Sequence, residues 1–113
     1  MTYRAPVADY QFILDQILGF DAVLETDAFA EVDGDTVSAI LEEAAKLASD
    51  VVAPLDRGGD LTPAKLVDGV VKTSPGFGDA LTQVAEGGWI GMLASPENGG
   101  GAPAGDTATT WAD

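Results

Sequence analysis

One long run of helical periodicity, from Asp35 to Arg57, constrains this chain more than any other feature. Glu42 and Lys46 are four residues apart and are expected to pair on its polar face. The apolar side chains recur at three- and four-residue steps and therefore share one face of a helix. These residues are Val37, Ile40, Leu41, Ala44, Leu47, Ala48, Val51, Val52 and Leu55. A helix with two such different faces needs partners for its apolar side.

The ends of this helix carry recognisable signals. Asp33 or Asp35 is expected to cap its start, since aspartate oxygens accept hydrogen bonds from the first backbone N–H groups of a helix. Pro54, followed by the Gly58-Gly59 pair, is expected to end it. The sequence thus predicts a helix over 35–55, to which the remaining elements must supply packing partners.

Shorter elements flank the long helix. The spacing predicts a first helix over 7–18, with Gly19 as its stop, and short helical turns between 20 and 32 capped by Asp21 and Asp27. The Asp68-Gly69 dipeptide between apolar pairs predicts a small hairpin. A further helix is expected over 76–86, capped by Ser74-Pro75 and ended by Gly87-Gly88, and residues 89–94 are expected to be extended.

The last part of the chain, 95–113, reads as a glycine-rich loop followed by the start of a truncated helix, with Asp106 as its cap. The fold class expected is therefore all-α: a small helical bundle with a minor hairpin and a Gly-rich C-terminal loop. The 113 residues suffice for a single domain, 1–113. Glycine occupies 14 positions, so bulky core residues are fewer than the 46% hydrophobic content suggests, and packing against another body is expected.

Charge and composition exclude several functions. A net charge of −14 argues against binding nucleic acid or an anionic membrane, which both require clustered Lys and Arg. The acids are either an ordinary solvated surface or a docking site for a basic partner. Without cysteine or histidine there are no disulfides, no thiolate zinc sites and no Cys- or His-based catalysis. The first residues lack the apolar region of a signal peptide, and no apolar run reaches membrane-spanning length, so we expect no signal peptide and a cytoplasmic location.

Candidate chemical motifs are weak. The stretch 99–104 matches G-x-G-x-x-A, but it follows no predicted buried strand, so a loop is favoured over a dinucleotide site. The Glu42-Glu43 pair is expected on a solvated face, with no nucleophile nearby. We therefore expect no catalytic residue and no metal site, and the cofactor-binding residues are unknown. The other features considered were Glu86, Glu97 and Asp106 as acids, Asp33-Gly34-Asp35 as a calcium-loop echo, Ser38 and Ser49 as acyl-carrier serines, and Trp89 with Trp111 as either ligand walls or core anchors.

Five short motifs, taken in order, resemble the N-terminal region of the acyl-CoA dehydrogenases. The nearest branch is that of the longer bacterial enzymes that include the methylmercaptopropionyl-CoA dehydrogenases, and the similarity extends from residue 3 to about 101. The motifs are Ala53-Pro54-Leu55-Asp56-Arg57-Gly58-Gly59-Asp60, Asp68-Gly69-Val70-Val71, Thr73-Ser74-Pro75-Gly76-Phe77, Glu86-Gly87-Gly88-Trp89-Ile90-Gly91 and Pro96-Glu97-Asn98-Gly99-Gly100.

The resemblance implies an all-helical N-terminal domain that packs against a β-barrel domain and a C-terminal helical bundle. In that family FAD lies between those other domains and a neighbouring subunit. A glutamate of the C-terminal bundle removes the α-proton, and the hydride passes to the flavin. None of these groups has a counterpart in this sequence, so whether this chain is itself an enzyme is uncertain.

Three functions therefore stay open. The first is the N-terminal domain of an FAD-dependent acyl-CoA dehydrogenase, inactive as this fragment, whose partners are the remaining domains or a like subunit of a homo-oligomer. The second is a free-standing acidic helical module that binds a protein through its apolar surface. The third is a stable small helical protein with no ligand.

Overall fold

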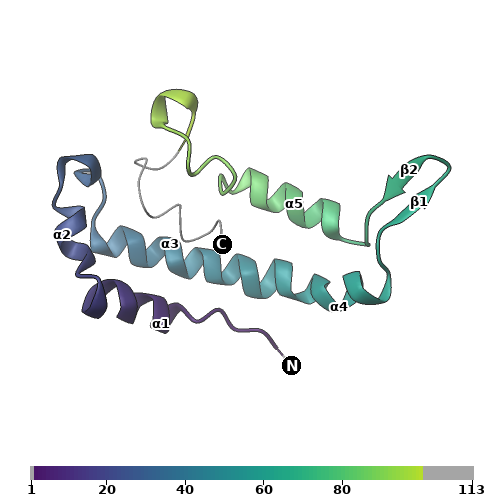
Figure 1. Cartoon of the computed structure of the whole chain (residues 1–113), viewed down its shortest axis with the longest axis horizontal. Coiled ribbons are helices and arrows are strands. Elements are labelled where there is room, and N and C mark those ends of the chain that lie inside the picture. Colours follow the sequence, from purple (N-terminus) through teal and green to yellow (C-terminus); the bar gives the residue numbers. More distant parts are fainter. Residues whose placement is uncertain (1, 101–113) are drawn as a thin grey trace.

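The long helix runs through most of the molecule in the computed structural model, which describes residues 2–100 (Figure 1). It comprises α3 (Gly34–Lys46), a π-helical segment η3 (Leu47–Val52) and α4 (Ala53–Leu61). Of the two predicted caps, Asp33 and Asp35, Asp33 is the N-cap: a carboxylate oxygen accepts a hydrogen bond from the backbone N–H of Thr36 at 2.7 Å. At 1.5 Å per residue the whole rod is about 40 Å long.

The prediction that Pro54 and Gly58-Gly59 end this helix is wrong. Pro54 lies in the first turn of α4, directly after the π-helical segment η3. The turn before it is π-helical, and this wider turn relieves the contact that a proline ring makes with the carbonyl four residues earlier. The helix therefore continues to Leu61, with Thr62 as its C-cap and Pro63 directly after.

The N-terminal helix lies alongside α3 (Figure 1). It consists of α1 (Val7–Phe12) and a π-helical segment η1 (Ile13–Ile17), which confirms the helix predicted over 7–18. Gly19, at φ +60°, then reverses the chain in the left-handed region that favours glycine. Two short helical turns follow, as expected: α2 (Phe20–Leu24) and the 3₁₀ turn η2 (Asp27–Phe29).

The caps expected for those two turns are wrong. The N-cap positions are Gly19 and Thr26, and neither makes a side-chain capping bond. Asp21 and Asp27 instead lie in the first turns, where a negative charge is favourable beside the exposed backbone N–H groups.

The predicted hairpin is present as β1 (Lys65–Val67) and β2 (Val70–Lys72), paired antiparallel. Asp68 and Gly69 form its two-residue turn with φ of +51° and +77°, and Asp-Gly is favoured where both central residues need positive φ. It projects from the end of the molecule beyond α4 (Figure 1). The register places Lys65 opposite Lys72 and Leu66 opposite Val71.

Helix α5 (Phe77–Glu86) returns along the long helix and confirms the helix expected over 76–86 (Figure 1). Its N-cap is Gly76, at φ +85°, rather than the predicted Ser74-Pro75. Ser74 is buried, and its backbone carbonyl accepts a hydrogen bond from the N–H of Phe77 at 3.2 Å. Gly87 and Gly88 end the helix as expected, Gly88 in the left-handed region.

Residues 89–94 are not extended as predicted, but form successive turns, with N–H···O=C bonds from Met92 to Trp89 and from Ala94 to Gly91. A six-residue strand without a neighbouring strand would leave its polar groups unpaired, so local turns satisfy them instead. The 3₁₀ turn η4 (Pro96–Asn98) follows. The helix expected from 107 onward and its cap Asp106 lie outside the described residues.

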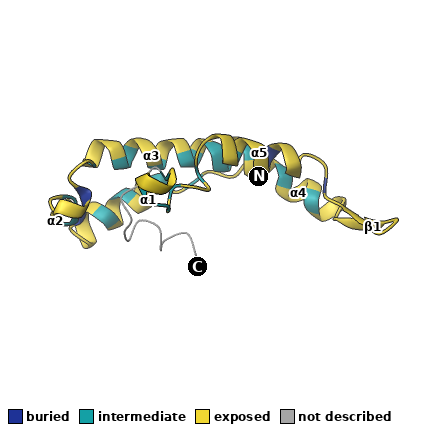
Figure 2. Ribbon diagram, turned by 90° about the horizontal axis from the view of Figure 1, so that it is seen from above, coloured by how far each residue is buried: buried dark blue, intermediate teal, exposed yellow. Residues whose placement is uncertain are grey.

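The molecule is elongated and thinly packed (Figure 2). Its radius of gyration is 17.1 Å, against about 13 Å for a compact chain of this length. Among residues 2–100 the buried residues are Phe20, Phe29, Ser74 and Ala80. The all-α class with a minor hairpin is confirmed, but these helices bury very little against one another. None of the helices in the described part is long and apolar enough to cross a bilayer.

Candidate functional site

The acidic residues considered for acid–base chemistry are exposed to solvent in the described part of the chain. Glu42, Glu43, Glu86 and Glu97 are all exposed. Lys46 pairs with Glu43, with a 2.5 Å Nζ–Oε1 distance, and not with Glu42 as predicted. This hydrogen bond raises the pKa of Lys46, and the negative charge of Glu43 adds to the effect. Nothing in this arrangement provides a nucleophile or a substrate-sized enclosure.

Asp33 serves the helix rather than a metal. Hydrogen bonds from Thr36, through its side chain first and its backbone N–H second, lower the pKa of Asp33. Within residues 2–100 no group of three or more acidic side chains is placed to hold a metal ion. The Asp33-Gly34-Asp35 sequence is therefore a capped helix start in this structure.

The glycine-rich motif begins in a tight turn, not after a strand. The N–H of Gly100 donates to the carbonyl of Ser95 at 3.0 Å, closing the turn around η4. A Cβ on Gly100 would lie 1.6 Å from the carbonyl oxygen of Ala94, so the close approach of two backbone segments requires glycine there. The remainder of the G-x-G-x-x-A match, 101–104, lies outside the described residues.

Trp89 is half-buried and packs closely against Gly87 at the end of α5. A Cβ added to Gly87 would lie only 2.8 Å from the Cδ1 atom of Trp89. This contact places Trp89 as an anchor of the turns that follow α5. Trp111, the other tryptophan considered, lies outside the described residues. Ser38 and Ser49 are both half-buried on the long helix and do not stand exposed at a helix start.

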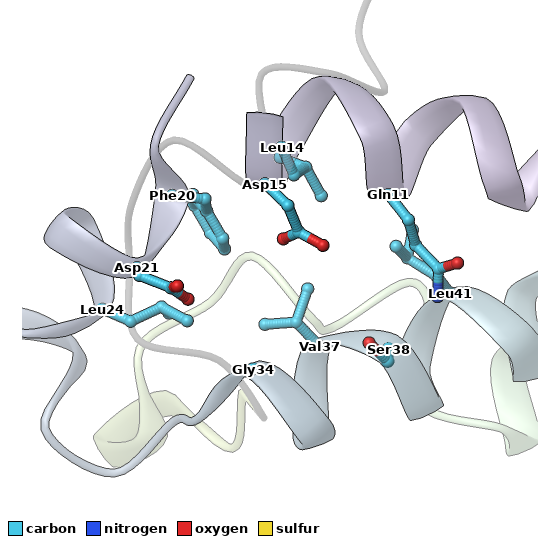
Figure 3. A pocket seen from close by; sticks show the side chains of 10 residues that line it. All are labelled: Gln11, Leu14, Asp15, Phe20, Asp21, Leu24, Gly34, Val37, Ser38 and Leu41. Atoms are coloured by element: carbon cyan, nitrogen blue, oxygen red, sulfur yellow. The ribbon is translucent and has the colours of Figure 1, made fainter. Parts of the chain in front are cut away.

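A hollow lies where α1, α2 and α3 meet (Figure 3). Its volume is about 10 Å³, which is room for about one water molecule and no ligand. Sequence analysis identified its helices but not their meeting point, because the loops that join them fix it. The lining residues are Gln11, Leu14, Asp15, Phe20, Asp21, Leu24, Gly34, Val37, Ser38 and Leu41.

A second hollow, of about 320 Å³, lies between the N-terminal segment and the middle of the long helix. Tyr3, Arg4, Lys46 and Asp50 line it, and all four are exposed. Ligand pockets of this size normally enclose most of the ligand within largely apolar walls. Neither hollow fits a flavin, because the first is too small and the second is shallow, open and charged.

The largest unusual feature is the exposed apolar surface. Soluble proteins rarely leave contiguous apolar patches uncovered, and such patches mark sites of interaction. Here large hydrophobic side chains are exposed along α1–η1, on both faces of the hairpin and on α5. They are Tyr3, Tyr10, Phe12, Ile13, Ile17, Leu18, Ile40, Val52, Leu61, Leu66, Val67, Val70, Val71, Phe77, Leu81, Ile90 and Leu93. This exposed apolar surface is therefore the candidate functional site of the described residues.

Comparison with known proteins shows what this chain is similar to. No protein-family model matches the sequence. Over 100 residues, 88% of this chain, it is 32% identical to the 3-methylmercaptopropionyl-CoA dehydrogenase of Ruegeria pomeroyi. The chain spans only 17% of that relative's length. The sequence is thus similar to an acyl-CoA dehydrogenase over most of its own length, and the resemblance indicated by its five motifs is confirmed.

Proposed function

We propose that this chain is the N-terminal helical domain of an FAD-dependent acyl-CoA dehydrogenase, an enzyme that oxidises the α,β carbon–carbon bond of acyl-CoA thioesters. The observation that carries the proposal is the alignment, which covers 88% of this chain but 17% of the relative. A fragment of a larger enzyme would show this imbalance. The proposed location of the enzyme is the cytoplasm.

The thin core supports the same proposal. Only four residues of the described part are buried, and large hydrophobic side chains of α1, α5 and the hairpin are exposed to solvent. Remaining domains of a larger enzyme, or a like subunit, would cover these side chains. Burial of apolar area contributes about 25 cal/mol per Å², so this contact would supply much of the stability that the chain cannot provide alone.

The chemical role of this chain in such an enzyme is positional. We assign the long helix, the Trp89 turns and the η4 turn to a wall beside the acyl-CoA cleft. We assign the FAD and the catalytic base to other domains, because neither of the two hollows described among residues 2–100 accommodates a flavin. The chain alone is therefore expected to be colourless and inactive.

The test is the intact mass and visible absorption spectrum of the protein purified from its source, with an acyl-CoA oxidation assay using an artificial electron acceptor. A polypeptide several times longer, with flavin bands and acyl-CoA-dependent reduction of the acceptor, is the expected result. A longer polypeptide without flavin or activity would contradict the proposal, as would turnover by the 113-residue chain alone.

One alternative is favoured by the exposed apolar surface itself: a free-standing acidic module that binds another protein. A colourless natural product of 113 residues would select this function over the enzyme domain. The two proposals share the same surface but differ in the length of the natural polypeptide, so one mass measurement separates them.

A further inference from the structure

The single asparagine of the sequence, Asn98, is followed directly by a glycine. The backbone nitrogen that follows an asparagine can attack the side-chain carbonyl carbon, because the two atoms then close a five-membered ring. Glycine opposes this attack least, since it has no Cβ to crowd the ring and its backbone turns freely. Asn98 and Gly99 are both exposed, so water reaches this dipeptide. Sequence and exposure together make it a candidate for spontaneous deamidation.

The η4 turn restrains both groups that would react. The Nδ2 of Asn98 donates a hydrogen bond to the Oγ of Ser95 at 2.9 Å, which holds the side-chain amide. The N–H of Gly99 donates to the carbonyl of Pro96 at 3.0 Å, so the attacking nitrogen has its proton engaged elsewhere. The N–H of Gly100 closes the turn on the carbonyl of Ser95, also at 3.0 Å. The reaction therefore requires this turn to open.

The two aspartate–glycine pairs, Asp33-Gly34 and Asp68-Gly69, have a carboxylate in place of the amide. An ionised carboxylate is a poor electrophile, so ring closure at these pairs is slower at neutral pH. The carboxylate of Asp33 is also held as the cap of α3 by the backbone N–H of Thr36 at 2.7 Å. Ring closure and hydrolysis at an aspartate leave the mass of the chain unchanged. Among these three pairs, a gain in mass therefore reports Asn98 alone.

We infer that Asn98 is a site of spontaneous deamidation whose rate is set by the η4 turn. Hydroxide removes the proton of the Gly99 N–H, the nitrogen bonds to the Cγ of Asn98, and the Cγ–Nδ2 bond breaks with release of ammonia. Water then opens the ring. The net reaction converts an amide and water into a carboxylate and ammonium, and it needs no oxidant or reductant. The inference goes beyond the proposed enzyme role and does not depend on it.

The two products differ from asparagine in charge and in backbone length. Hydrolysis at Cγ gives aspartate, which adds a negative charge beside Glu97. Hydrolysis at the main-chain carbonyl gives isoaspartate, whose backbone runs through the former side chain and is one carbon longer. The turn packs two backbone segments tightly, since a Cβ on Gly100 would lie 1.6 Å from the carbonyl oxygen of Ala94. Isoaspartate at this position is therefore expected to open the η4 turn.

The rates of deamidation in the folded and the unfolded chain test the inference. The 113-residue protein is incubated at mildly alkaline pH with and without guanidinium chloride, and the peptide that contains Asn98 is quantified by mass spectrometry. Far-UV circular dichroism verifies the helical state. Asn98 is expected to deamidate in both samples, about tenfold more slowly in the folded chain, because the hydrogen bonds of the turn must break first. Methylation by isoaspartyl methyltransferase detects the isoaspartate product.

Three variants separate the restraint from the chemistry. Ser95→Ala removes the hydroxyl that holds the Asn98 amide, and should raise the rate in the folded chain about two- to fivefold but not in guanidinium chloride. Ser49→Ala, in η3, is the matched control and should change neither rate. Gly99→Val places a branched side chain beside the attacking nitrogen. It should slow the reaction in the unfolded chain, where the φ of +80° at this position no longer matters.

Three results would overturn the inference. An unmodified Asn98 in the unfolded chain would mean that the site is not reactive. Equal rates in the helical and the unfolded chain would mean that the turn does not set the rate, as would equal rates for Ser95→Ala and Ser49→Ala in the folded state. Flavin content and acyl-CoA oxidation play no part in these measurements. The deamidation site can therefore fail while the enzyme proposal stands, and the reverse.

Discussion

The two ends of the long helix are held in opposite ways. At the N-terminal end, α1, α2 and α3 meet around aromatic side chains, and Phe20 and Phe29 are among the four buried residues described. At the other end α4 and α5 approach each other closely at glycines, which have no side chain to keep them apart. A Cβ on Gly59 would lie 2.8 Å from the Phe77 ring, and one on Gly76 would lie 2.9 Å from Leu55. Large aromatic side chains fill the first junction, whereas glycines allow the backbone and side chains of the second to pack closely.

This difference teaches where each junction is vulnerable. A junction filled by large side chains is weakened by deletion, because removal leaves a cavity and forfeits transfer free energy. A junction made by glycine is weakened by addition, because an extra methyl group forces a neighbour or the backbone to shift. The two ends should therefore respond in opposite directions to side-chain size.

The largest effect is expected from Phe20→Ala at the filled end. Phe20 is only 8% exposed and lines the hollow beside Leu24 and Val37 (Figure 3). Its truncation should lower the free energy of unfolding by about 3 kcal/mol. Urea denaturation followed by far-UV circular dichroism measures this loss.

Phe12→Ala is the control for that change. Phe12 lies in α1 of the same region but is 58% exposed, so its truncation should change the free energy of unfolding by at most about 0.5 kcal/mol. Equal losses for the two variants would contradict the view that the aromatic packing around Phe20 holds this end together.

At the other end, Gly76→Ala is expected to destabilise by about 1–2 kcal/mol, the cost of a non-glycine residue in a left-handed conformation. The φ of +85° and the close approach of the Leu55 side chain both oppose a methyl group here. Thermal unfolding monitored by circular dichroism gives the change in Tm.

The same substitution two residues later should act in the opposite direction. Gly78 lies in α5 with nothing within 4 Å of the position of an added Cβ. Gly78→Ala should therefore raise the free energy of unfolding by about 0.5 kcal/mol, through better helix propensity alone. If both variants moved Tm the same way, glycine-dependent packing would not explain the α4–α5 junction.

The sequence predicted the features of this fold that depend on local chemistry and missed those that depend on packing. Local chemistry was enough to predict the helices over 7–18 and 76–86 and the hairpin, and it narrowed the cap of the long helix to Asp33 or Asp35, of which Asp33 is the one observed. Pro54 was misread as a stop, since the π-helical turn that accommodates it responds to the rest of the helix. Trp89 was misplaced in an extended segment, because its turns depend on contact with Gly87.

The interaction surface was harder to predict than the fold. Periodic apolar residues are normally taken as core, and nothing in the order of Tyr10, Ile13 and Ile17 tells which side α3 will cover. Only the three-dimensional arrangement shows that the apolar arc of α1–η1 is wider than its contact with α3. The family resemblance, by contrast, depended on motif order and needed no structure.

A smaller effect concerns the cap at the filled end. Asp33 has a pKa below its ordinary value of 3.8, because Thr36 hydrogen-bonds to the carboxylate. A depressed pKa means that the ionised form stabilises the fold. This contribution is full well above pH 3.8 and is lost as the pH falls below 3.8 through the lower pKa of the folded state.

Asp33→Asn isolates this contribution, because asparagine caps a helix about as well but does not titrate. The unaltered chain should be slightly more stable than the variant at neutral pH, and the difference should shrink as the solution is acidified. The other acids titrate in both proteins and cancel. Urea titrations at a series of pH values supply the comparison, and a constant difference would show that the Asp33 charge does not contribute.

The smallest effect is expected in the middle of the long helix, between the two junctions. The Lys46–Glu43 pair is fully exposed, and exposed ion pairs contribute little because water and salt screen the charges while two long side chains lose freedom. Lys46→Gln should therefore leave Tm nearly unchanged at physiological salt and lower it only slightly at low salt. A large fall in Tm would mean that electrostatics stabilises this stretch of helix. The ion pair would then contribute to stability alongside the aromatic packing at one end and the glycine-dependent packing at the other.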